Sequence, residues 1–143
     1  MSFFKSMTAI ELTTAELEYS EKSSFRNLPQ GEYKINDRER LMVGISGMVT
    51  FYLDGDVHRE KGPACIFPGR ASQWRKHGML HRETGPAFVW VDGKIEFWLN
   101  NHRFWSRKEW KRAINKLRSE NNSSESGSYL ASFKPISSNI LGI

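Results

Sequence analysis

The chain has 143 residues, of which 38 % are hydrophobic, 13 % aromatic and 26 % charged, and its net charge is +5. This aromatic content argues against wholesale disorder, and the short apolar runs exclude a membrane-spanning helix. A single cysteine, Cys65, excludes an internal disulfide framework and a cysteine-rich zinc site, and it favours the cytoplasm over a secretory route.

Residues 1–28 are expected to form an N-terminal segment with one short helix. Thr13 and Glu16 have the spacing of a capping box, in which each side chain bonds the backbone N–H of the other residue. The helix is acidic and should end near Glu21. We expect it to cover one end of the domain that follows, because a stack of repeats needs an atypical unit at each end.

Residues 29–105 contain an internal repeat with a period of 23. The stretch 51–66 (FYLDGDVHREKGPACI) aligns with 74–89 (WRKHGMLHRETGPAFV), and an incomplete third copy begins at Phe97. Self-similarity at such a period is typical of stacked repeat folds. The expected fold class is therefore mostly β, an antiparallel meander of stacked β-hairpin repeats that is capped by the N-terminal helix and by a basic C-terminal helix.

Within each copy the pattern predicts short strands and tight turns. Apolar residues alternate at 49–53 and 95–99, as in strands with one buried face. The pairs Asp54-Gly55 and Asp92-Gly93 predict two-residue hairpin turns, and His77-Gly78 takes the place of the first pair in the second copy. The continuous apolar run at 87–91 suggests a strand covered on both faces.

Residues 106–119 are expected to form a C-terminal capping helix, opened by a capping box of Ser106 and Glu109. Its apolar stripe should pack on Trp105 and the last strands, and consists of Trp110, Ala113, Ile114 and Leu117. Residues 103–119 hold seven basic residues and one acidic residue, a net charge of +6. The outward basic face comprises Arg107, Lys108, Lys111, Arg112 and Arg118.

Residues 120–143 read as a polar, flexible linker followed by an apolar tail. Tyr129 and Phe133 lie in this tail, together with other apolar residues. The pattern suggests a docking segment, either for the body of this chain or for a partner.

The repeat resembles a known family. Residues 74–87 read W-x-x-x-G-x-x-H-R-x-x-G-P-A, and 51–64 match with Phe at the aromatic position. This unit resembles the MORN-like repeat variants of bacterial, phage and large-virus proteins. The resemblance implies a scaffolding or interaction module. The compact size and the atypical flanks suggest a phage or viral accessory protein, located in the host cytoplasm or the virion.

The polar residues of the repeat have two interpretations. A ladder of imidazole and guanidinium groups can hold a phosphate or a carboxylate. Alternatively, each His-Arg pair fixes the turn before Gly-Pro by bonding backbone carbonyls, which we favour because catalysis needs one asymmetric constellation. These residues are His58, Arg59, Gly62, Pro63, His81, Arg82, Gly85 and Pro86. We expect no catalytic residue, cofactor or metal site, and Cys65 reads as core packing because Phe88 replaces it in the next copy.

Two classes of function remain. Tyr52, Arg75 and Trp98 occupy equivalent positions and form an aromatic row, which is either open to a protein partner or covered by the chain itself. We expect a non-enzymatic interaction module that binds a host or virion protein through this row and the tail. The alternative is a nucleic-acid-binding accessory protein, in which the basic helix contacts phosphates and Trp98 or Trp105 stacks on bases. Unpaired hairpin edges also leave a homo-oligomer open.

Overall fold

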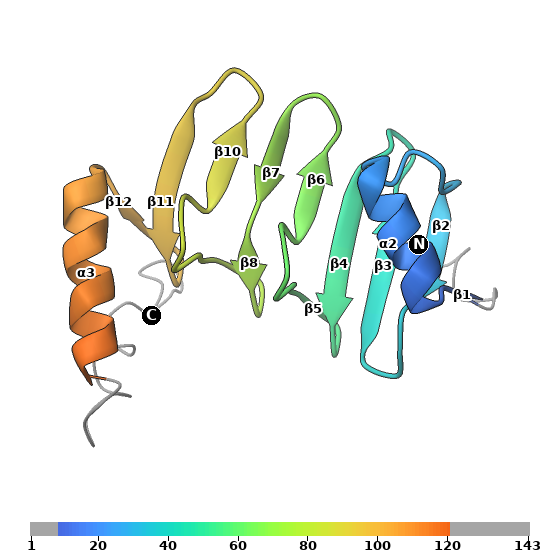
Figure 1. Ribbon diagram of the computed structural model, residues 1–143, viewed down its shortest axis with the longest axis horizontal. Coiled ribbons are helices and arrows are strands. Elements are labelled where there is room, and N and C mark those ends of the chain that lie inside the picture. Colours follow the sequence, from blue (N-terminus) through green and yellow to red (C-terminus); the bar gives the residue numbers. More distant parts are fainter. Residues whose placement is uncertain (1–8, 121–143) are drawn as a thin grey trace.

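The computed structural model describes residues 9–120, and these residues form a mostly β protein with two helices (Figure 1). This confirms the predicted fold class. The strands are β1 (Ile10–Glu11), β2 (Gly31–Lys34), β3 (Glu39–Val43), β4 (Val49–Leu53), β5 (Asp56–Val57), β6 (Cys65–Phe67), β7 (Ala71–Gln73), β8 (Arg75–Lys76), β9 (Met79–Leu80), β10 (Phe88–Trp90), β11 (Ile95–Leu99) and β12 (His102–Phe104). The helices are α2 (Thr14–Lys22) and α3 (Arg107–Glu120).

Ten strands of the described part form one sheet in the order β1-β2-β3-β4-β6-β7-β10-β11-β12, with β5 paired to β4. The pairs are antiparallel, except that β1 runs parallel to β2. Strands β8 and β9 form a separate two-stranded hairpin. The chain therefore proceeds along the sheet as a meander, and successive repeats lie side by side in Figure 1.

The turn chemistry explains most of the hairpins. Asp54 and Gly55 have φ of 50° and 89°, and His77 and Gly78 have φ of 49° and 82°, as a type I′ turn requires. The prediction of a two-residue turn at Asp92-Gly93 is wrong. The Trp90 N–H donates to the carbonyl of Lys94 at 2.9 Å, so the turn contains one more residue than a two-residue turn holds.

The N-terminal core lies under α2. The capping box is present: the Thr13 hydroxyl accepts the Glu16 N–H at 3.1 Å, and the Glu16 carboxylate accepts the Thr13 N–H at 2.8 Å. The helix packs Leu17 on a cluster of buried side chains, in which the rings of Phe25 and Phe51 meet edge to face at 5.4 Å. The acidic helix therefore covers strands β2 to β4, as Figure 1 shows.

The C-terminal helix buries the predicted apolar stripe, which consists of Trp110, Ala113, Ile114 and Leu117. The prediction that the stripe packs on the last strands is confirmed, because Trp110, Ala113 and Ile114 cluster with Phe97 and Leu99 of β11. The prediction that it packs on Trp105 is wrong, since Trp105 is 77 % exposed. Trp105 lies instead against the guanidinium of Arg103, 3.9 Å from the ring centre. Since Arg103 is the register partner of Trp98, this pair faces away from Phe97.

The sheet consequently has two different faces. Both helices pack on the face that carries Phe51 and Phe97, which we call the helix face. No described helix packs on the face that carries Tyr52 and Trp98, which we call the open face. Neither α2 nor α3 has the length and apolar character needed to cross a bilayer.

Candidate functional site

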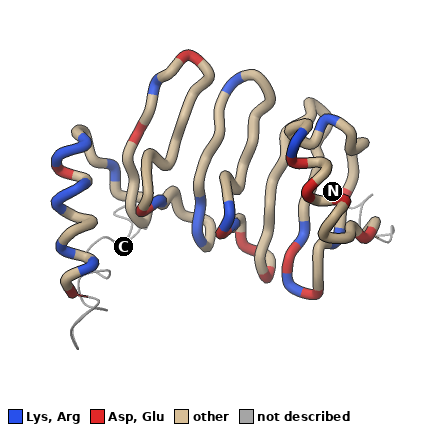
Figure 2. Tube along the Cα trace, in the orientation of Figure 1, with Lys and Arg blue, Asp and Glu red and all other residues tan. Residues whose placement is uncertain are grey.

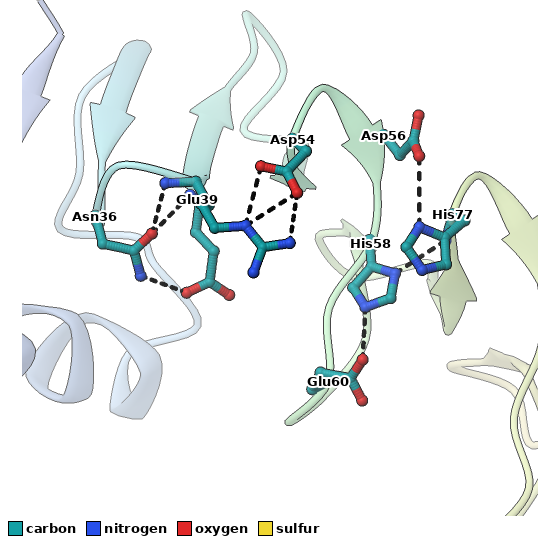
Figure 3. Close-up of polar contacts among 8 residues, drawn as sticks. Asn36, Glu39, Asp54, Asp56, His58, Glu60 and His77 are labelled. Atoms are coloured by element: carbon teal, nitrogen blue, oxygen red, sulfur yellow. Dashed lines mark hydrogen bonds and ion pairs between the residues drawn. The ribbon is translucent and has the colours of Figure 1, made fainter.

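The two repeat histidines make the same pair of hydrogen bonds. In the first copy, Nδ1 of buried His58 accepts the backbone N–H of His77 at 2.9 Å, and Nε2 lies 2.7 Å from the Glu60 carboxylate (Figure 3). In the second copy, Nδ1 of His81 accepts the N–H of Asn100 at 3.0 Å, and Nε2 lies 2.8 Å from Glu83. Each histidine therefore joins its own repeat to the turn of the next repeat.

These bonds define the state of the imidazoles. Because Nδ1 accepts a backbone N–H, the ring proton resides on Nε2 and is donated to the carboxylate. That hydrogen bond lowers the pKa of Glu60 and of Glu83. The expectation that the histidines bond backbone carbonyls is wrong, because each imidazole accepts from an amide in the following copy.

The repeat arginines stack on the repeat aromatics. The guanidinium of Arg59 lies 4.0 Å from the ring centre of Phe51, and its Nη1 donates to the Pro63 carbonyl at 3.3 Å. Arg82 lies 3.9 Å from the ring centre of Trp74 and donates to the Pro86 carbonyl at 3.1 Å. For the arginines, the predicted bonds to backbone carbonyls are present.

The glycines of the repeat make room for these guanidinium groups. A Cβ atom added to Gly62 would lie 2.9 Å from Nη1 of Arg59, and one added to Gly85 would lie 3.2 Å from Nη1 of Arg82. The aromatic, His-Arg and Gly-Pro positions of the signature therefore form a single packing unit. A phosphate ligand is not needed to explain any of them.

The incomplete third copy obtains its cation from the capping helix. Trp105 stands where the repeat arginine is expected, but Arg107 of α3 places its guanidinium 5.0 Å from the ring centre of Phe97. The aromatic position thus keeps a cation above it in all three copies. In the first two copies the arginine follows the aromatic residue by eight positions, whereas Arg107 follows Phe97 by ten. The displaced arginine was the available signal in the sequence.

The structure brings Tyr52, Arg75 and Trp98 to the open face, on β4, β8 and β11, and all three are partly exposed. The side chain of Arg75 lies flat on the sheet, because it donates to Gln73 at 2.9 Å and to the Gly78 carbonyl at 2.7 Å. The Trp98 indole donates to Glu96 at 2.8 Å. Three residues with equivalent positions in the sequence therefore have equivalent positions in space.

Phe88 and Trp90 extend this face and were missed in the sequence. Their rings stack at 3.8 Å with an interplanar angle of 5°. The register pairs of Phe88 with Gln73 and Glu96 place them on the open face. The apolar run at 87–91 is not covered on both faces, since residues 88–90 are partly exposed and Val91 is 75 % exposed. Alternate residues of the run face opposite sides of the sheet, and this alternation was the available signal for the exposed pair. It is hidden in the sequence because every residue of the run is apolar.

The basic residues of α3 are exposed, and Figure 2 shows blue positions along this helix. The exposed cations are Arg107, Lys108, Lys111, Arg112, Lys116 and Arg118. In the described chain, no carboxylate lies within ion-pair distance of Lys108, Lys111 or Arg112. The tail residues Tyr129 and Phe133 lie outside the residues that the structure describes.

Cys65 and the metal-ligating residue types form no reactive or metal-binding cluster among the described residues. Burial raises the pKa of the Cys65 thiol, which faces Gln73 across the β6–β7 pair. Within residues 9–120, no three His, Cys, Asp or Glu side chains are grouped so that they could hold a metal ion.

The repeated strands and their duplicated bonds make this chain a β-hairpin repeat protein of mostly β class. Comparisons with protein-family models, with curated proteins and with solved structures found no match.

Proposed function

We propose that this protein is a non-enzymatic interaction module that binds another protein through the open face of its sheet. The observation that carries the proposal is the row of Tyr52, Arg75 and Trp98 across three copies, extended by the stacked pair of Phe88 and Trp90. Tyrosine, tryptophan and arginine dominate the binding energy of protein interfaces, and these residues are partly exposed on one face of the sheet.

The duplicated histidines support the non-enzymatic part. A catalytic site needs one asymmetric set of groups, whereas His58 and His81 make matching bonds in successive copies. The resemblance to MORN-like repeat variants supports a host or virion protein as the partner, in the host cytoplasm or the virion. The tail residues Tyr129 and Phe133 would supply a second contact.

The test uses the full chain as bait in lysate of the host cell, after nuclease treatment and at about 300 mM salt, where charge-driven capture is weak. A double variant, Tyr52→Ser with Trp98→Ser, should lose a discrete protein that the wild type retains. The matched control is Tyr19→Ser, which removes a 67 % exposed tyrosine from α2. Equal capture by the double variant and the control would refute the proposal.

A second candidate function is nucleic-acid binding, and the exposed cations of α3 favour it (Figure 2). Lys111→Glu with Arg112→Glu should abolish binding of a labelled duplex in an anisotropy titration. Wild-type affinity should fall steeply between about 50 and 200 mM salt. Binding that survives the charge reversal would eliminate this candidate, and Tyr19→Ser on α2 is the control that should leave binding intact.

A further inference from the structure

The two stacked arginines of the repeats differ in what lies at the end of their guanidinium groups. Nη2 of Arg59 donates to Oε2 of Glu21 at 2.6 Å, so α2 supplies its carboxylate, and the side chain is only 9 % exposed. For Arg82, no carboxylate of the described residues lies within ion-pair distance. The same packing unit is therefore complete in the first copy and lacks its acidic partner in the second.

Arg82 opens into a hollow of about 280 Å³ on the helix face. Trp74 and Arg82 form one wall, and Arg59 lies at the other side with Glu21 of α2. The residues that line the hollow all come from the two repeats. The carbonyl of Arg82 accepts the Trp110 indole at 3.3 Å, so α3 packs beside this arginine.

The charges around the hollow favour an anion. Four cations line it, and two of them already meet a carboxylate: Arg59 bonds Glu21, and Lys76 lies 3.6 Å from Glu60. Arg82 and Lys61 have no such partner among the described residues. Its carboxylates are already engaged, since Glu60 bonds His58 and Glu83 bonds His81. Desolvation lowers the pKa of Arg82, and an incoming carboxylate would compensate for that desolvation.

Helix α2 shows what kind of segment fits. Its Leu17 packs on the apolar cluster, and Glu21, one turn later, reaches Arg59. In the second copy Ile66 and Val89 flank Ser72 on the helix face, and Trp74 follows two residues later. Ile66 also packs against the apolar cluster under α2, so this strip continues from that cluster. An apolar strip beside a stacked guanidinium therefore recurs one repeat further along the sheet.

We propose that Trp74 and Arg82 form a receptor for a Glu or Asp side chain carried by an amphipathic helix of a partner protein, in the way that Arg59 receives Glu21. The guanidinium is held flat by the indole and by Pro86, so its fork is preorganised for a carboxylate. This surface lies on the helix face and is independent of the open face. Failure of one proposal leaves the other untouched.

The probe is a blocked peptide with the sequence of residues 12–25, which contains the α2 helix, titrated into the ¹⁵N-labelled full chain. The resonances of the Trp74 indole N–H and the Arg82 Nε–H should shift saturably, with half-saturation at or below about 1 mM peptide. A peptide with Glu21→Gln should bind at least about fivefold more weakly.

Protein variants separate the site from general charge attraction. Arg82→Gln should weaken binding as much as the peptide substitution does. Lys94→Gln is the matched control, because it removes a cation that lies 5.6 Å from the ring centre of another tryptophan, Trp90, and should leave binding unchanged. The Glu21→Gln peptide keeps the protein intact, so the test does not depend on the folding of any variant.

Several outcomes overturn the proposal. They are shifts confined to the cations of α3, shifts confined to Phe51 and Arg59 through exchange with α2, and equal binding of the two peptides. If residues 121–143 or a second copy of the chain occupied the hollow, the peptide would leave Trp74 unshifted, and this result also overturns it.

Discussion

The first and second copies of the repeat share a bonding scheme and differ in their surroundings. In both, a histidine accepts an amide of the next copy and an arginine stacks on an aromatic ring above a glycine. In the first copy α2 adds Glu21 to Arg59, while the second copy lies between the helices. The repeat arginine is therefore bonded by α2 in the first copy and borders an accessible hollow in the second.

This difference separates residues that build the array from residues that are available to a ligand. Both ring nitrogens of each histidine are engaged. Nδ1 accepts an amide of the next copy, and Nε2 contacts a carboxylate of its own copy. Arg82 keeps part of its hydrogen-bonding capacity, since its bond to the Pro86 carbonyl uses Nη1 alone.

The largest effect is expected from the histidines. His58→Ala and His81→Ala each remove an acceptor from a backbone amide and leave space in a buried site, so each should lower the free energy of unfolding by about 3 kcal/mol. Urea denaturation measures this. The control is Tyr19→Ser, which removes a 67 % exposed side chain of α2 and should lower the free energy of unfolding by less than about 0.5 kcal/mol. A loss in one copy only would contradict the equivalence of the two bonds.

The next effect concerns the glycines. Gly62→Ala forces the Arg59 guanidinium off the Phe51 ring and should cost about 1 kcal/mol, with a smaller loss for Gly85→Ala because its Cβ has more room. The cost of Gly62→Ala should largely vanish when Arg59 is already alanine. A double-mutant cycle measures this coupling, and strict additivity of the two substitutions would show that the glycine serves another purpose.

A smaller effect is expected at the ion pair that distinguishes the copies. Glu21→Gln should lower stability by less than about 1 kcal/mol, because the glutamate is half exposed, and the loss should shrink at high salt. Glu18→Gln is the matched control on the exposed side of α2. Equal and salt-independent losses for the two variants would contradict the pairing of Glu21 with Arg59.

The smallest effect is expected from acid. The pKa values of Glu60 and Glu83 lie below the ordinary value of 4.5 in the folded chain, so the unfolded chain binds more protons in this range. Their stabilising contribution is present above about pH 4.5 and is lost as the pH falls through the folded-state values. Unfolding followed against pH should show a shallower acid slope in Glu60→Gln and Glu83→Gln, and an unchanged slope would contradict these shifts.

Much of the fold could be predicted because its signals are local. The capping box of Thr13 and Glu16, the turn at Asp54-Gly55 and the stripe through Trp110 depend on residues within one turn or one helix. The packing of that stripe on the last strands could be predicted, but the predicted contact with Trp105 is wrong. Whether Trp105 or Phe97 meets α3 depends on which face of β11 and β12 the helix covers, and no local pattern fixes that face.

The sequence by itself determined the period of 23, the mostly β class and the positions that recur in each copy. Only the tertiary structure decided what each recurring residue contacts, because those partners are supplied by the next repeat or by a helix far along the chain. His58 finds its donor 19 residues later, and Arg59 finds Glu21 38 residues earlier. Arg82 meets no such carboxylate in the described chain, because α2 is placed above the first copy and α3 contributes a tryptophan to the second.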